Sequence, residues 1–183
     1  YDDGPVVFSK NGTYALFSAS SKKGKLQLYF SVLENGKWSK PFLHPVSRPG
    51  DSYCHPFLVD EKTLFFCSDK AGGRGGMDIY FSRFENYNWS NPINLGPKVN
   101  TSANELFPYV SNDAVLYFSS KTKSGKGDLD IYSFGLNDSS ISKPIAMEAP
   151  INSSDDDFGI CFNSDLRSGY FSSNRIKNEG DNV

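Results

Sequence analysis

One four-residue sequence recurs through this 183-residue chain at a nearly constant spacing. Met77-Asp78-Ile79-Tyr80 is followed 52 residues later by Leu129-Asp130-Ile131-Tyr132 and preceded 51 residues earlier by Leu26-Gln27-Leu28-Tyr29. Two further landmarks keep this register, namely a proline (Pro5, Pro56, Pro108) and a Trp-Ser-x-Pro sequence (Trp38 to Pro41, Trp89 to Pro92, and Ile141 to Pro144 with Ile for Trp). A repeat of this length is typical of solenoids and propellers.

Each repeat has the pattern of short strands. In the second copy, runs of apolar, aromatic and β-branched residues predict strands at 57–59, 63–67, 79–84 and 89–95. The first copy contains Asn35-Gly36, a pair that accepts the positive φ angles of a tight hairpin. No stretch keeps a helical period of apolar residues, so we expect four strands and no helix in each repeat.

Four-stranded units of this length are typical of propeller blades, whose faces the 15 Phe and 10 Tyr of this chain can supply. Helical repeats would need long amphipathic segments, and a β-sandwich would not explain the repetition. We therefore predict an all-β fold, a β-propeller of four-stranded antiparallel blades. The blades are predicted at about 5–43, 54–95, 106–147 and, incomplete, 158–183.

The chain holds about three and a half such repeats, whereas propellers typically close with four to eight blades. An open arc leaves blade faces and strand edges exposed. We therefore expect a fragment of a propeller of five to seven blades.

Composition argues against several classes of function. The formal net charge of −2 gives no overall cationic field for nucleic acid, and no run of 18 apolar residues predicts a transmembrane segment.

The three cysteines, Cys54, Cys67 and Cys161, show no Cys-x-x-Cys spacing, and both histidines lie apart from any such motif. We expect three free, buried thiols, no metal site and no cofactor.

The second copy resembles the TolB-type, WD40-like propeller repeat. The residues that carry the resemblance are an aromatic strand with a polar end, 64–70, then the Gly-rich loop 72–76 and Asp78-Ile79-Tyr80. Copy three repeats this pattern, and copy four opens with Gly169-Tyr170-Phe171-Ser172-Ser173-Asn174-Arg175. The resemblance covers almost the whole chain and implies a propeller.

A narrower resemblance is carried by Trp89-Ser90-Asn91-Pro92, Ile93-Asn94-Leu95-Gly96, Val99-Asn100-Thr101 and Glu105-Leu106-Phe107-Pro108. This run is similar to the propeller domains of OmpA-family cell-envelope proteins of Bacteroidota, including a peptidoglycan-anchoring component of type IX secretion. The resemblance implies a noncatalytic interaction module that is periplasmic or associated with the outer membrane.

Positive charge gathers in the loops expected between the second and third strands of each blade. We call these residues the basic rim and predict that they bind an acidic protein surface or an anionic glycan. Charged loop tips that merely face solvent are the alternative. The rim comprises Lys22, Lys23, Lys70, Arg74, Lys121, Lys123, Lys126 and Arg175.

Other candidates precede or begin predicted strands. His55, Glu105 and Asp157 could converge at the mouth of the central channel, either to bind a ligand or to form turn hydrogen bonds. Asp78 and Asp130 resemble the paired carboxylates of a glycosidase, but a residue present in every blade is expected to accept hydrogen bonds within its own loop. Tyr80 and Tyr132, with Trp38 and Trp89, are expected to pack between blades, although the Trp side chains could stack on sugars.

The sequence therefore favours a noncatalytic module that binds a protein partner in the cell envelope through the face with longer loops. A glycan is a possible second partner. The alternative is a carbohydrate-active propeller or one associated with a peptidase.

Overall fold

The computed structural model describes residues 3–21, 24–122, 125–138, 140, 143–163 and 166–175. All regular elements in these ranges are strands, in four antiparallel sheets. The first sheet holds β1 (Asp3–Phe8), β2 (Tyr14–Ser20), β3 (Leu26–Glu34), β4 (Lys37–Trp38) and β5 (Phe42–Leu43). The second holds β6 (Tyr53–Asp60), β7 (Thr63–Ser68), β8 (Asp78–Glu85), β9 (Asn88–Trp89) and β10 (Ile93–Asn94). The third holds β11 (Glu105–Val110), β12 (Val115–Ser120), β13 (Asp130–Gly135) and β14 (Ile145–Ala146), and the fourth β15 (Asp157–Phe162) and β16 (Gly169–Ser173).

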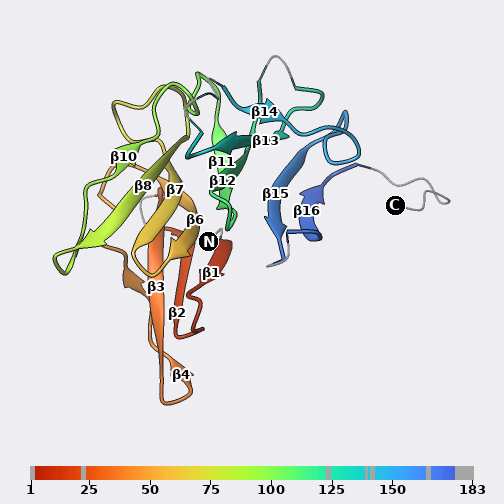
Figure 1. Ribbon diagram of the computed structural model, residues 1–183. Helices are drawn as coiled ribbons and strands as arrows, with labels where there is room; N and C mark the ends of the chain where they lie inside the picture. Colours follow the sequence, from red (N-terminus) through yellow and green to blue (C-terminus); the bar gives the residue numbers. More distant parts are fainter. Residues whose placement is uncertain are drawn as a thin grey trace.

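The four sheets lie side by side in an arc (Figure 1), with the first strand of each sheet toward the inside of the arc. These inner strands follow one another in space, since β6 contacts both β1 and β11, and β11 contacts β15. Each sheet is an antiparallel meander whose strands pair mainly in chain order. This is the blade architecture of a β-propeller, and the predicted fold class is confirmed.

The repeated proline marks a bulge in the inner strand. The pairing of first and second strands shifts register at Pro5, Pro56 and Pro108, where proline has no N–H to donate. The preceding residues His55 and Phe107 have positive φ angles of 49° and 53°. The bulge is therefore a shared feature of the strand that faces the propeller axis.

The fourth strand is shorter than predicted. Instead of one strand over 89–95, the second blade has β9 and β10 with a break between them. In the break, the Ser90 hydroxyl accepts a hydrogen bond from the backbone N–H of Arg83 at 3.0 Å, and Pro92 has no N–H to donate. The Trp-Ser-x-Pro sequence thus marks the interruption of the outer strand.

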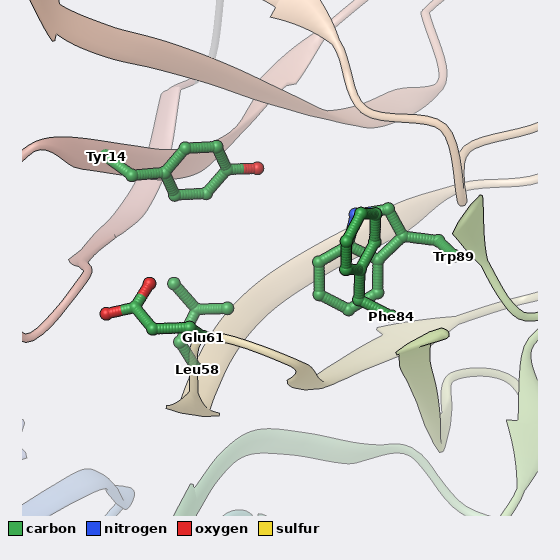
Figure 2. Close-up of a pocket in the computed structure, with 5 residues that line it drawn as sticks. All are labelled: Tyr14, Leu58, Glu61, Phe84 and Trp89. Atoms are coloured by element: carbon green, nitrogen blue, oxygen red, sulfur yellow. The ribbon is translucent and has the colours of Figure 1, made fainter. Parts of the chain in front are cut away.

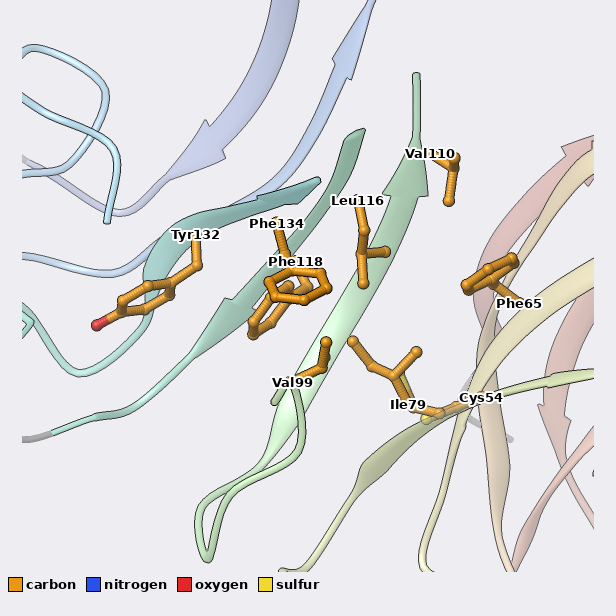
Figure 3. Packing of buried hydrophobic residues seen from close by; sticks show 10 residues of the cluster. Cys54, Phe65, Ile79, Val99, Val110, Leu116, Phe118, Tyr132 and Phe134 are labelled. Atoms are coloured by element: carbon orange, nitrogen blue, oxygen red, sulfur yellow. The ribbon is translucent and has the colours of Figure 1, made fainter. Parts of the chain in front are cut away.

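Blades pack through stacked aromatic pairs. Phe66 and Tyr80 stack at 6.2 Å between ring centroids and are buried between the first and second blades. Phe118 and Tyr132 stack at 5.9 Å between the second and third blades, in the apolar cluster that Figure 3 shows. The phenylalanines and tyrosines at these recurring positions therefore form the core between blades.

All three cysteines are free thiols. Cys54 and Cys67 are buried directly opposite each other on β6 and β7. The expectation that Cys161 is also buried was wrong, because its position on β15 faces the open cleft along the inner strands.

Candidate functional site

The Gly-rich loop between β7 and β8 folds around the repeated aspartate. The buried carboxylate of Asp78 accepts hydrogen bonds from the backbone N–H groups of Arg74 (2.6 Å) and Gly75 (3.0 Å) and from the side-chain amide of Asn94 (2.8 Å). A Cβ atom at Gly73 would lie 2.8 Å from that carboxylate. The loop therefore needs glycine in order to approach the carboxylate closely.

The third blade keeps the aspartate but satisfies it less completely. The buried Asp130 accepts a hydrogen bond from the backbone N–H of Gly127 at 3.0 Å, while its Oδ1 atom has no partner among the described residues. By strand register, Ala146 stands where the second blade has Asn94. Among the described residues, Asp130 thus lacks two of the donors that Asp78 has, a second loop N–H and the amide that Asn94 supplies.

The same loops bind the connection to the next blade. The N–H of Met77 donates to the side chain of Asn104 at 2.8 Å, and the N–H of Glu105 donates to the Met77 carbonyl at 2.7 Å. Asn100 clamps Ile79, accepting from its N–H and donating to its carbonyl at 2.8 and 2.9 Å. The next junction repeats both arrangements with Leu129, Asp156, Asp157, Asn152 and Ile131.

Glu105 and Asp157, two of the predicted channel-mouth residues, begin the equivalent strands β11 and β15, and each is fully buried with partners of its own. Glu105 accepts from the N–H and hydroxyl of Thr101 (3.0 and 2.6 Å) and from the Ser120 hydroxyl (3.1 Å). Burial raises the pKa of Glu105, although these hydrogen bonds oppose the rise. These hydrogen bonds fix the start of β11 to the preceding connection and to β12, which is a structural role.

Asp157 is held in its ionised form. Burial alone would raise its pKa, but hydrogen bonds from Arg175, Ser173 and Ser153 outweigh that effect and lower it. The guanidinium of Arg175 pairs with Asp157 and also donates to the carbonyls of Pro150 (2.8 Å) and Ile151 (2.7 Å). Arg175 therefore ties the fourth sheet to the connection before it.

His55 occupies a different position from Glu105 and Asp157. Its ring stacks on Phe107 at 3.8 Å between centroids, and its Nδ1 atom accepts a hydrogen bond from the Phe107 N–H at 3.3 Å. Both residues line an apolar cleft of about 310 Å³ along the inner strands. The three predicted channel-mouth residues are thus not brought together as one polar site.

The basic rim is only partly available for binding. Lys22, Lys23 and Lys123 lie outside the described residues. Lys121 pairs with Asp128 at 2.7 Å, and Lys126 lies 4.0 Å from Glu148. Within the described part of the chain, no ion pair involves Lys70 or Arg74. Beside Lys126, a polar cleft of about 320 Å³ is lined by Asp128, Asp155 and Asp156, so this face carries both signs of charge.

The two tryptophans pack differently. Trp38 is 44% exposed and contacts Phe8 at 5.9 Å between ring centroids. Trp89 lies between the first and second blades, 5.0 Å from the ring of the fully buried His44 and 5.6 Å from Phe84. Trp89 therefore contributes to packing and also to a neighbouring hollow.

Sequence reasoning missed this hollow, which we call the aromatic groove. Its first part, of about 210 Å³, is lined by Tyr14, Leu58, Glu61, Phe84 and Trp89 (Figure 2). A second part, of about 270 Å³, shares Tyr14, Phe84 and Trp89 and adds Phe30, His44, Pro45, Tyr87 and Asn88. Departures from the repeat could have revealed it, because His44 replaces the apolar Leu95 and Met147 of later copies, and Tyr87 replaces Gly36.

One Cys-His neighbourhood has the elements of a nucleophilic site. The Cys67 thiol lowers the pKa of Cys54 by hydrogen bonding, and His55 adds to that effect, although burial opposes it. Cys54 is, however, only 2% exposed and lies in the core cluster between blades. A substrate could not reach it without separating the blades.

Across the described ranges, no group of three or more His, Cys, Asp and Glu side chains is arranged to hold a metal ion. The same residues include no helix long and apolar enough to cross a membrane.

No protein-family model and no curated protein matches this chain. Solved structures show similar folds. TolB from Agrobacterium tumefaciens superimposes with a TM-score of 0.63 and 17% identity, over 91% of this chain and 52% of that one. A prolyl endopeptidase gives 0.60 and 14% over 94% and 23%, and a thermostable family-43 glycoside hydrolase gives 0.55 and 14% over 92% and 63%.

The chain thus spans about half the length of that TolB and about a quarter of the peptidase. Identities this low show the fold alone, which is a TolB-like β-propeller. Because TolB and two kinds of enzyme share it, the fold does not decide the function.

We expect Asp78→Ala to destabilise the protein more than Asp130→Ala. The first change leaves two loop N–H groups and the Asn94 amide without their acceptor and should cost about 3 kcal/mol, whereas the second removes fewer hydrogen bonds and should cost about 1 kcal/mol. Urea unfolding measures both. Equal costs, or none, would contradict the described hydrogen bonds.

The substitution Ala146→Asn should stabilise the third blade. Its amide would supply one of the donors that Asp130 lacks, worth about 1 kcal/mol or a rise of about 2–4 °C in Tm. Asn94→Ala in the second blade is the matched reverse change and should lower Tm. A fall in Tm for Ala146→Asn would mean that the blade has no room for the amide.

Arg175→Gln should destabilise the protein by about 2 kcal/mol at pH 7, and this difference should shrink in acid. Because the folded pKa of Asp157 is lowered, its stabilisation is present above the unfolded pKa of about 3.9 and is lost as pH falls through the folded value. Urea unfolding of both proteins between neutral and acidic pH tests this. A difference that stays constant with pH would contradict the ion pair.

Proposed function

We propose that this chain is a noncatalytic propeller module that binds a protein partner in the bacterial cell envelope through the loop face that carries Lys70 and Arg74. The observation that carries the proposal is the presentation of Arg74. Its side chain is exposed, while its backbone N–H is fixed on the buried Asp78. The loop is also bonded to the connection that follows, since the Gly76 N–H donates to the Ala103 carbonyl at 3.2 Å.

A fixed loop has little backbone freedom to lose when its charged side chain binds, so the interaction of Arg74 with an acidic surface is favoured. The repeated carboxylates support a noncatalytic role, because Asp78 is occupied by hydrogen bonds in its own loop and Glu105 and Asp157 cap strands. The envelope location, periplasmic or associated with the outer membrane, rests on the resemblance to OmpA-family propellers of the type IX secretion machinery.

The test is affinity capture from a bacterial envelope extract with this chain as bait, at low and moderate salt. Arg74→Glu combined with Lys126→Glu should weaken retention of the partner about tenfold or more, because two attractive contacts become repulsive, while loss of the exposed contact between Lys126 and Glu148 should lower Tm only slightly. The control is Lys10→Glu with Lys62→Glu, the same charge change in two exposed turns at the opposite ends of the strands.

Equal retention by the two double variants would contradict binding through this face. Recovery of soluble glycans or peptides in place of a protein would favour the carbohydrate-active or peptidase-associated alternative. Higher salt should weaken a genuine rim interaction, since exposed charges are screened.

A further inference from the structure

The aromatic groove lies at the opposite ends of the strands from the basic rim. Glu61 belongs to the turn between β6 and β7, and Trp89 to the short strand after β8, whereas the rim loops join second to third strands. Tyr14 stacks on Phe30 at 5.3 Å between ring centroids, and Phe84 contacts Trp89 at 5.6 Å. Figure 2 shows Tyr14 on one side of the hollow and Phe84 and Trp89 on the other.

Tyr87 at the edge of this groove is costly to the fold. It has a φ of 61° and is 93% exposed. The first blade places Gly36, with a φ of 75°, at the same point of the same turn. A bulky residue in the left-handed region is strained, and a side chain this exposed recovers almost nothing by packing. Such strain gathers where a side chain serves binding.

The charge of the groove has one sign. Glu61 is the one side chain with a formal charge among the residues that line its two parts. Burial raises the pKa of Tyr14 and lowers the pKa of His44 to about 4, so both stay neutral near pH 7. Aromatic faces are electronegative and attract cations, and an adjacent carboxylate adds to that attraction. A sugar would instead rely on directed hydrogen bonds to polar groups such as Glu61 and Asn88, so an uncharged sugar is the competing ligand in the test.

We propose that the aromatic groove binds an organic ammonium group, with Trp89, Phe84, Tyr14 and Tyr87 facing the cation and Glu61 supplying the opposite charge. A small quaternary amine and a lysine side chain share this chemistry. The inference goes beyond the proposed function and does not depend on the rim.

The test uses this chain with Trp38→Phe, so that fluorescence reports on Trp89, the other of its two tryptophans. Choline, its uncharged carbon analogue, and lysine amide acetylated at its α-nitrogen are titrated separately. We expect saturable quenching by an ammonium ligand with an affinity at least about fivefold above that of the carbon analogue. Tighter binding of choline would assign a free quaternary amine, and tighter binding of the lysine compound a protein side chain.

Two variants separate binding from folding. Tyr87→Gly relieves the strained turn, so its Tm should be unchanged or higher while ammonium affinity falls about threefold. Glu61→Gln should also lower the affinity about threefold, whereas Glu85→Gln, an exposed carboxylate outside the lining, should not change it.

The proposal is overturned by an absence of saturable quenching with either ammonium ligand. It is equally overturned if the carbon analogue or N-acetylglucosamine binds as tightly, because the groove would then be an apolar or sugar site. The Arg74→Glu, Lys126→Glu variant should bind choline normally, so failure of the rim proposal leaves this result unaffected.

Discussion

The rest of the structure depends on the burial of each blade's stacked Phe-Tyr pair against the blade before it. Phe66 with Tyr80 and Phe118 with Tyr132 are nearly inaccessible to solvent. Full burial of side chains of this size stabilises a fold by about 1.5–3 kcal/mol each, so one pair supplies a large part of the cohesion between two blades. The equivalent pair of the first blade, Phe17 and Tyr29, stacks at 6.2 Å but is only half-buried.

Polar residues that recur between blades keep the apolar faces of neighbouring blades in register. A twisted four-stranded sheet is less firmly fixed against its neighbour if apolar burial alone holds it, because the hydrophobic effect is not directional. Asn100 and the Asp78 loop fix the position by directed hydrogen bonds to Ile79 and to the following connection. The glycines of the loop allow it to approach the following connection this closely, since a Cβ at Gly75 would lie 2.1 Å from the Ala103 carbonyl. Apolar burial therefore supplies the cohesion, and the repeated polar residues specify the geometry.

Features that recur between copies could be predicted from the sequence, because one blade explains the others. The strands, the structural setting of Asp78 and the packing of Tyr80 belong to this group. Features that depend on backbone detail could not, such as the bulge at Pro56 and the strand break after Trp89. The strand break reflects the missing N–H of Pro92, whereas the bulge also occurs in the fourth sheet, between Phe158 and Cys161, where no proline stands. The pairing of Arg175 with Asp157 joins residues of two neighbouring units, so no single repeat reveals it.

The aromatic groove was missed for the opposite reason, since it consists of departures from the repeat. Selection for folding keeps equivalent positions alike, because each blade meets the same neighbours. Tyr87 in place of Gly36 and His44 in place of an apolar residue both oppose that constraint, and they lie beside the same hollow. One of them strains the backbone, and the other buries an imidazole Nε2 atom with no hydrogen-bond partner among the described residues. In a repeat protein, unfavourable exceptions that converge on one place are better evidence for a binding site than the shared motifs, whose role is to hold the blades together.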